Sequence, residues 1–204
     1  MTLAEMITAV RTRLGNPSTD GFFSDAHLTD LINEALQAIS SEDDWPWLQA
    51  SDNISLVAGT SAYTPIAGWV RTKQLFIQEG DPLTMIPLAE IDSYGIQTTG
   101  TPDVYTIFGE QILVRPVPQT AATLIHQYVK TEPILAGTAS PIMPVMFHFS
   151  IVAFACYLAH LRQQRNELAQ LEHRAYDDWY KRMVSFRRRS QVPMRVRVRP
   201  GSWL

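Results

Sequence analysis

Residues 144–188 read PVMFHFSIVAFACYLAHLRQQRNELAQLEHRAYDDWYKRMVSFRR, and they carry the strongest structural signal in the chain. Pro144 opens the stretch, and residues 145–188 contain neither proline nor glycine. Those two residue types have the poorest helix propensities, so their absence favours uninterrupted helix. The stretch predicts one long helix over residues 144–188, which would span roughly 65 Å at a rise of 1.5 Å per residue.

The hydrophobic residues change pattern halfway along this stretch. Residues 145–161 are apolar on most sides, which is typical of a buried helix, and they are short for a membrane span of about 20 residues. The second half narrows to a stripe of Leu168, Leu171, Ala175, Trp179 and Met183. A stripe packs on a single side. The helix is therefore expected to begin in the core and to end on the surface or against a partner, with residues 163–166 as the place for a kink.

Two shorter helices are predicted upstream. Thr2 and Glu5 fit a capping box, in which each side chain binds a backbone N–H of the first turn. Apolar residues then follow at helical spacing, so we expect a helix over residues 2–14. Ser24 can cap a second helix over residues 24–41.

The middle of the chain, at about residues 52–131, changes to the two-residue period of strands. Most of the thirteen prolines lie between the predicted helices, so this part is expected to consist of short strands joined by turns. Residues 104–108 and 111–115 flank Gly109-Glu110, a pair that suits a type II′ hairpin turn.

Together these elements predict an α+β protein. Its expected architecture is an antiparallel helical bundle with a long C-terminal helix and an inserted small antiparallel β-domain. Residues 1–188 are expected to form a single domain, and residues 189–204 an extended basic tail.

The charge is distributed unevenly along the chain. The net charge is −3, yet the last eighteen residues hold six of the seventeen basic residues and no acid. Residues 1–186 therefore carry eleven basic and all twenty acidic residues, which gives −9. One cysteine excludes an intrachain disulfide, and the N-terminal residues show no signal-peptide pattern, so a secreted disulfide scaffold is not expected.

No catalytic or cofactor-binding motif is convincing. A phosphate loop, a nucleophile elbow and the spacing of metal ligands are all missing from the sequence. Cys156 and His160 share a helix face at i, i+4 and are the best enzymatic candidates. Apolar neighbours raise a thiol's pKa, so we favour a buried thiol beside a histidine at the edge of the core. No enzymatic activity, cofactor or metal is expected.

Two further groups have a functional and a structural interpretation. The acidic run Glu42–Asp44 could bind a cation, but it lacks the spacing of a calcium loop, and a solvated helix end is favoured. Trp45 and Trp47 could stack on a ligand, although such pairs more often pack a helix end, here onto the β-rich region.

The basic tail has three interpretations: phosphate binding, strand addition onto a partner, or a disordered solubilising tail. Valine alternates with arginine, which places one type on each face of a strand and favours strand addition with a terminal anchor. The residues concerned are Arg187, Arg188, Arg189, Arg195, Val196, Arg197, Val198, Arg199, Trp203 and Leu204.

The order of several motifs resembles the head-to-tail adaptor (connector, or head-completion) proteins of tailed phages, including the tail-tubular proteins of short-tailed phages. Residues 23–35 and 44–48 resemble the family's N-terminal helix and its exit. Residues 100–118 resemble its central hairpin, and residues 141–188 its last helix. The resemblance covers residues 3–188.

This resemblance implies a structural virion protein in the neck of the phage, made in the host cytoplasm. Subunits of the family form a ring, typically of about twelve copies, beneath the portal protein. The ring contacts the next tail or head-completion protein and continues a channel through which DNA passes without sequence-specific contact. The segment after the long helix docks on the portal, and no membrane is involved. The alternative from the residues alone is a DNA-binding or packaging accessory protein that uses the arginine tail.

Overall fold

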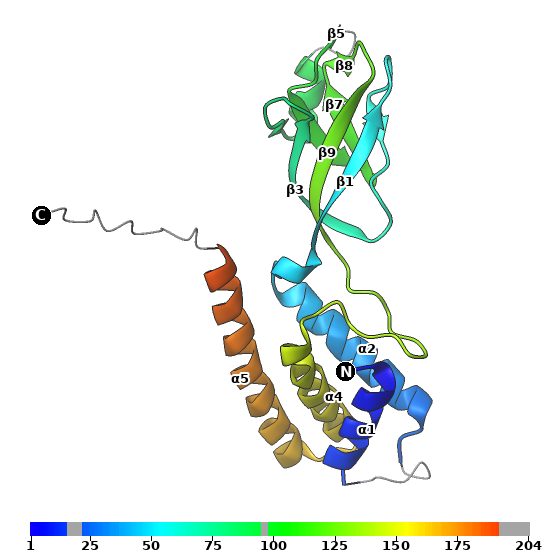
Figure 1. Ribbon diagram of the computed structural model, residues 1–204, viewed down its shortest axis with the longest axis vertical. Coiled ribbons are helices and arrows are strands. Elements are labelled where there is room, and N and C mark those ends of the chain that lie inside the picture. Colours follow the sequence, from blue (N-terminus) through cyan, green and yellow to red (C-terminus); the bar gives the residue numbers. More distant parts are fainter. Residues whose placement is uncertain (16–21, 95–97, 192–204) are drawn as a thin grey trace, which may run out of the picture. The chain divides into compact units, whose positions relative to one another are not determined.

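The computed structural model describes residues 1–15, 22–94 and 98–191, and it has an α+β fold, as the sequence predicted (Figure 1). The chain divides into two compact units. The first, here called the helical unit, comprises Met1–Trp47 and Glu132–Leu204, and the second, the β unit, comprises Leu48–Thr131. That residues 1–188 act as one domain stays a prediction.

The first two helices form where the sequence predicts them. Helix α1 spans Leu3–Arg13 and α2 spans Asp25–Glu42. The capping box of α1 is confirmed: Glu5 N donates to Thr2 Oγ1, and Thr2 N donates to Glu5 Oε2. Ser24 caps α2 by accepting a hydrogen bond from His27 N. These bonds satisfy backbone donors that a helix start leaves without partners.

The single helix predicted over residues 144–188 is wrong. The structure has instead a short 3₁₀ turn, η3 (Val145–Phe147), and two helices, α4 (His148–Arg162) and α5 (Asn166–Gln191). Gln164 adopts a left-handed φ of 58°, and two backbone bonds close the end of α4: Gln164 N to Leu161 O and Arg165 N to His160 O. This is a Schellman end, which glycine usually occupies.

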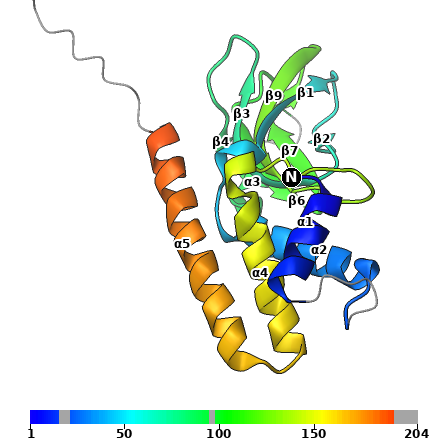
Figure 2. The same ribbon diagram turned by 60° about the horizontal axis from the view of Figure 1, so that its bottom comes forward.

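Helices α4 and α5 pack against each other in antiparallel directions. One ring pair, Phe147 and Phe186, joins the start of α4 to the end of α5 with centroids 5.4 Å apart, and a second pair, Phe154 and Tyr176, joins the middles of the two helices at 4.8 Å. In both views of the ribbon, α4 lies between α5 and the α1–α2 pair (Figures 1 and 2). The reversal is favourable because it covers the apolar surface of both helices, whereas a straight helix would leave it in water.

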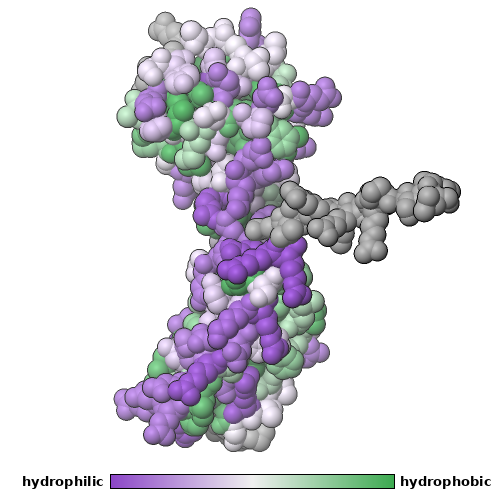
Figure 3. All heavy atoms as spheres, turned by 90° about the vertical axis from the view of Figure 1, so that its left-hand side faces the viewer, coloured by the Kyte–Doolittle hydropathy of each residue, from purple (hydrophilic) through white to green (hydrophobic). Residues whose placement is uncertain are grey.

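The surface of the helical unit on the α5 side is mostly hydrophilic, with smaller hydrophobic areas between (Figure 3). Within the unit, α4 is buried along most of its length, including Ile151, Val152, Ala155 and Cys156. The prediction that residues 145–161 form a buried helix therefore holds for most of α4 but not for Val145, Met146, Phe149 and Leu161, which are exposed. A fully buried aliphatic side chain contributes roughly 1.5–3 kcal/mol. The core of the unit therefore draws on α4 together with α2, whose buried large aliphatic residues are Leu28, Leu31, Ile32, Leu36 and Ile39.

The irregular segment before α4 is held by amide side chains of α2. Asn33 binds both backbone groups of Leu135: its Nδ2 donates to the carbonyl at 3.1 Å, and its Oδ1 accepts from the amide at 2.8 Å. Gln37 donates to the carbonyl of Glu132 at 2.7 Å, and the buried Glu132 carboxylate accepts from the amides of Ile142 and Met143. These bonds replace secondary structure in satisfying the backbone.

The β unit contains two main sheets. One has the order β1-β9-β3 and is fully antiparallel, with β1 at Gln49–Leu56, β3 at Trp69–Ile77 and β9 at Ala122–Lys130. The other has the order β2-β7-β6-β4, with bounds Ala62–Tyr63, Gln111–Arg115, Val104–Phe108 and Thr84–Met85. A small third sheet pairs β5 (Thr99–Gly100) with β8 (Val117–Pro118). Short helical turns are η1 (Pro46–Leu48), α3 (Leu88–Ile91) and η2 (Asp92–Tyr94).

Two details of the β unit differ from the sequence predictions. The pairs β4–β6 and β5–β8 are parallel, so the unit is not wholly antiparallel. The β6–β7 hairpin has positive φ at both turn residues, 55° at Gly109 and 61° at Glu110. That pattern is a type I′ turn, not the predicted type II′, and its twist matches that of the flanking strands.

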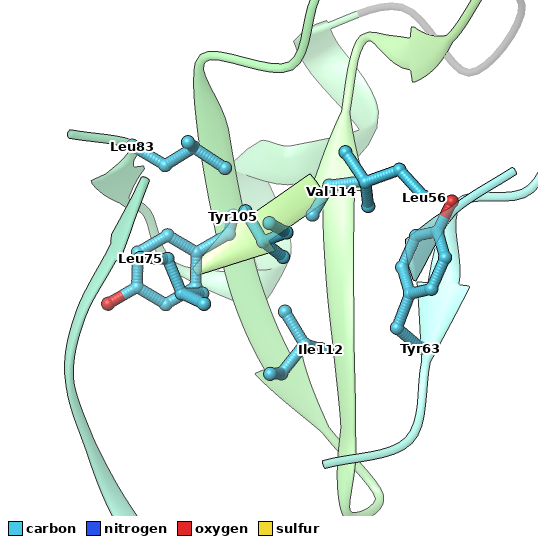
Figure 4. Packing of buried hydrophobic residues seen from close by; sticks show 8 residues of the cluster. Leu56, Tyr63, Leu75, Leu83, Tyr105, Ile112 and Val114 are labelled. Atoms are coloured by element: carbon cyan, nitrogen blue, oxygen red, sulfur yellow. The ribbon is translucent and has the colours of Figure 1, made fainter. Parts of the chain in front are cut away.

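The two main sheets of the β unit share one hydrophobic core (Figure 4). Every main sheet strand except β4 contributes, and Tyr63 also fixes a turn because its hydroxyl donates to Thr60 O at 2.8 Å. The buried members are Leu56, Tyr63, Leu75, Leu83, Tyr105, Ile112, Val114 and Leu124.

Candidate partner-binding surfaces

The structure shows only the beginning of the predicted docking tail. Arg187, Arg188 and Arg189 lie in the last turns of α5. Arg187 forms an ion pair with Asp43 at the end of α2, whereas the side chains of Arg188 and Arg189 are exposed. The first of the three therefore stabilises the fold, and the other two face outward. The remaining predicted residues lie outside the described part of the chain: Arg195, Val196, Arg197, Val198, Arg199, Trp203 and Leu204.

The acidic run at the end of α2 contacts α5, although Glu42 is exposed and Asp43 and Asp44 are half-buried. Tyr176 Oη donates to Glu42 Oε2 at 2.8 Å, and Arg187 holds Asp43. Burial raises the pKa of Glu42, and the bond from Tyr176 opposes that change. Among the described residues there is no group of three or more His, Cys, Asp or Glu side chains that could hold a metal ion. The run is thus the partly solvated helix end that the sequence suggested, and two of its carboxylates also bind α5.

Cys156 and His160 are both buried in α4. Burial raises the pKa of the Cys156 thiol to about 12, and the nearby Glu172 carboxylate acts in the same direction. Burial also lowers the pKa of His160. A cysteine nucleophile reacts as the thiolate, so a thiol with this pKa is unreactive near neutral pH.

Trp45 and Trp47 pack inside the helical unit. Their rings stack with centroids 4.9 Å apart, and Trp45 Nε1 donates to Ile39 O at 2.7 Å. Trp45 also meets Tyr180 edge to face, and Trp47 meets Phe186, so the rings support α5. The sequence predicted a packing role for this pair but placed it against the β-rich region.

A shallow groove of about 490 Å³ lies between η3 and the C-terminal half of α5, and we call it the α5 groove. Its charged lining residues are all basic, while Met146 is 60% exposed and the neighbouring Phe149 is 49% exposed. Arg182 lies 4.7 Å from the ring centre of Trp179, which is stacked on Phe149. The lining comprises Met146, Phe147, Trp179, Lys181, Arg182, Ser185, Phe186 and Arg189.

Sequence reasoning missed this groove because it assigned residues 145–161 to buried helix throughout. It also placed the packing stripe of α5 slightly too early. Ala169, Tyr176 and Met183 are buried against the unit, but Leu168 and Leu171 are exposed. The sequence signal for the groove was that Lys181 and Arg182 lie close to Trp179. An amphipathic pattern alone does not indicate that these residues line a groove.

The segment Val145–Arg162 is long and apolar enough to cross a membrane by length and composition. More than half of it, 56%, is buried inside the protein. It includes α4, which α1, α2 and α5 all contact. This burial accounts for its hydrophobicity without a lipid partner.

Comparison with known proteins gives one family. Over residues 1–199 the sequence matches the family described as SU10 adaptor protein. The match includes both compact units and continues into the basic tail. No curated protein matches the sequence.

Proposed function

Because the chain belongs to the SU10 adaptor protein family, we propose that it assembles as a ring beneath the portal. It is a structural head-to-tail adaptor of a tailed phage in this proposal. The ring has about twelve copies, as the resemblance to this class implies. It joins the head to the next tail or head-completion protein and lies in the neck of the virion after assembly in the host cytoplasm. The family match over nearly the whole chain is the observation that carries this proposal.

The channel of the ring passes DNA without sequence-specific contact. Residues 1–186 have a net charge of −9, and an acidic wall repels phosphates, so it does not hold the DNA. This charge also argues against a protein whose folded body grips nucleic acid.

In this proposal the portal anchor is the set of tail residues predicted from the sequence, from Arg188 to Leu204, with Arg187 securing the base of the tail to α2. The exposed Arg188 and Arg189 lead directly into it. The α5 groove, which Arg189 helps to line, has a basic lining that repels a basic segment. The tail therefore favours an acidic surface elsewhere, and the portal offers a separate chain for it.

The second candidate is a DNA-binding or packaging accessory protein. It is favoured by one observation: residues 179–191 carry five basic residues and no acid at the point where the tail begins. Salt separates the two candidates. Binding through phosphates weakens with a slope of about −0.9 in log K against log salt for each phosphate neutralised. A docked strand with buried valines resists salt better because its apolar contacts do not depend on counterions.

The experiment measures binding of the full chain and of a chain ending at Gln191 to the portal protein of the same phage, by native mass spectrometry. The cut after Gln191 keeps α5 and the Arg187–Asp43 ion pair, which a cut after Phe186 would remove. We expect the full chain to bind and the shorter chain to lose most of its affinity. Salt-sensitive binding to duplex DNA without portal binding would favour the second candidate.

A further inference from the structure

The α5 groove has an electrostatic complement on the β unit. Residues 74–114 contain six acidic residues and no lysine, arginine or histidine. Five exposed residues of this stretch, three acidic and two apolar, define what we call the acidic face: Glu79, Asp81, Met85, Leu88 and Glu90. The groove has the opposite composition, since its charged lining residues are Lys181, Arg182 and Arg189.

The acidic face is held firmly by the β unit. Leu83 N donates to Leu75 O at 2.8 Å, and Ile86 N donates to Tyr105 O at 2.9 Å. The side chain of Ile86 is buried, and the adjacent residue Met85 of β4 points to the opposite side and is exposed. The exposed side chains of this face therefore have a fixed backbone beneath them.

The two surfaces also match in their apolar parts. Met85 is 60% exposed and Leu88 is 42% exposed, and both stand between Asp81 and Glu90 in the sequence of the acidic face. Met146 and Phe149 are exposed to a similar degree beside the basic groove. Exposed ion pairs alone stabilise contacts weakly, whereas apolar side chains that leave water together supply most of the affinity of an interface.

The groove suits aliphatic side chains better than nucleic-acid bases. The Trp179 ring already stacks on Phe149 and lies beneath the guanidinium of Arg182. Phe147 and Phe186 meet edge to face with centroids 5.4 Å apart. Rings that are engaged with each other offer little free area for stacking on bases, while the flexible Met146 can adapt to methionine and leucine side chains.

We propose that the α5 groove of one copy binds the acidic face of a second copy. The inference rests on the proposed ring and specifies which surfaces join its subunits. Because the groove and the face are different surfaces, the contact is head-to-tail, and repeated contacts of this kind close into a ring when the rotation allows it.

The test exchanges the charges of the two surfaces in the full chain. The groove variant carries Lys181→Glu and Arg182→Glu, which lie outside the portal anchor, and the face variant carries Asp81→Lys and Glu90→Lys. Each variant alone brings like charges together and is expected to lose about tenfold or more in self-association, measured by sedimentation equilibrium. An equimolar mixture is expected to regain the wild-type association, because every contact in an alternating assembly again pairs opposite charges.

Two controls make the result specific. Arg174→Glu in the helical unit and Glu110→Lys in the β unit reverse exposed charges outside both surfaces and should leave association unchanged. A mixture of unlabelled and ¹⁵N-labelled wild-type chains is cross-linked with a carbodiimide, both free and with the portal. The cross-links should join Lys181 of one chain to Glu79, Asp81 or Glu90 of a differently labelled chain. Cross-links found only within one chain, or none in either sample, would overturn the inference.

The outcomes also separate this inference from the proposed function. If the wild-type chain assembles on the portal and both charge variants assemble equally well, the interface is wrong and the adaptor function stands. If the charge exchange restores self-association but the chain never binds the portal, the interface stands and the proposed function fails.

Discussion

Gln164 provides a quantitative test of the reversal between α4 and α5. Its φ of 58° lies in the left-handed region, which costs a residue with a side chain roughly 1–2 kcal/mol and costs glycine nothing. Glycine also makes the unfolded chain more flexible, which offsets about 0.5–1 kcal/mol of that gain. Gln164→Gly should therefore stabilise the protein by about 0.5–1 kcal/mol.

The same replacement one residue earlier is the matched control. Gln163 has a φ of −86°, which any residue adopts, so Gln163→Gly gains no relief and should destabilise by at least about 0.5 kcal/mol. Thermal unfolding is followed by far-ultraviolet circular dichroism, which reports mainly the helical unit. A change of 1 kcal/mol moves the midpoint by roughly 2–4 °C in a protein of this size. If both replacements lower the midpoint equally, the chain does not reverse at Gln164 and the reasoning is refuted.

Three further predictions concern buried groups. Burial lowers the pKa of His126, His148 and His160, so the folded chain keeps these histidines neutral. Their contribution to stability should be complete above pH about 6.5 and should be lost as the pH falls through their lower folded-state pKa values, as urea titrations would show. An unchanged free energy of unfolding on acidification to pH about 5 would contradict this prediction. The Cys156 thiol, with a pKa of about 12, should react with a thiol reagent at pH about 8 only as fast as the protein unfolds, and rapid labelling of the native chain would contradict its burial. Asn33→Asp removes the donor to the Leu135 carbonyl and should lower the free energy of unfolding by roughly 1–3 kcal/mol, while the exposed Asn53→Asp should change it little; equal effects would contradict the role of Asn33.

The elements with local signals were predictable from the sequence. The start of α1 was indicated by Thr2 with Glu5, and the start of α2 by Ser24, because these side chains bind backbone donors within the same turn. The glycine at position 109 indicated the turn of the β6–β7 hairpin. The type of that turn was not predictable, because Glu110 adopts a positive φ that its side chain disfavours and that the paired strands impose.

The features that depend on tertiary contact were not predictable. The kink expected at residues 163–166 lies where α4 gives way to α5, but the full reversal has no glycine to indicate it, since Gln164 occupies the left-handed position. Helix α5 folds back because its apolar face packs on α4. The α5 groove arises only after that reversal brings Met146 beside Arg182 and Phe186. A periodic sequence specifies that a helix has an apolar face, but it does not specify which neighbour covers it.

The portal complex tests the adaptor proposal most directly. Electron cryomicroscopy of the portal protein of the same phage, incubated with the full chain, should show a closed ring coaxial with the portal, with the segment after Gln191 lying on portal surface and no such ring for the chain that ends there. A portal that stays bare with the full chain at saturating concentration, while the chain itself remains folded, would contradict the proposal.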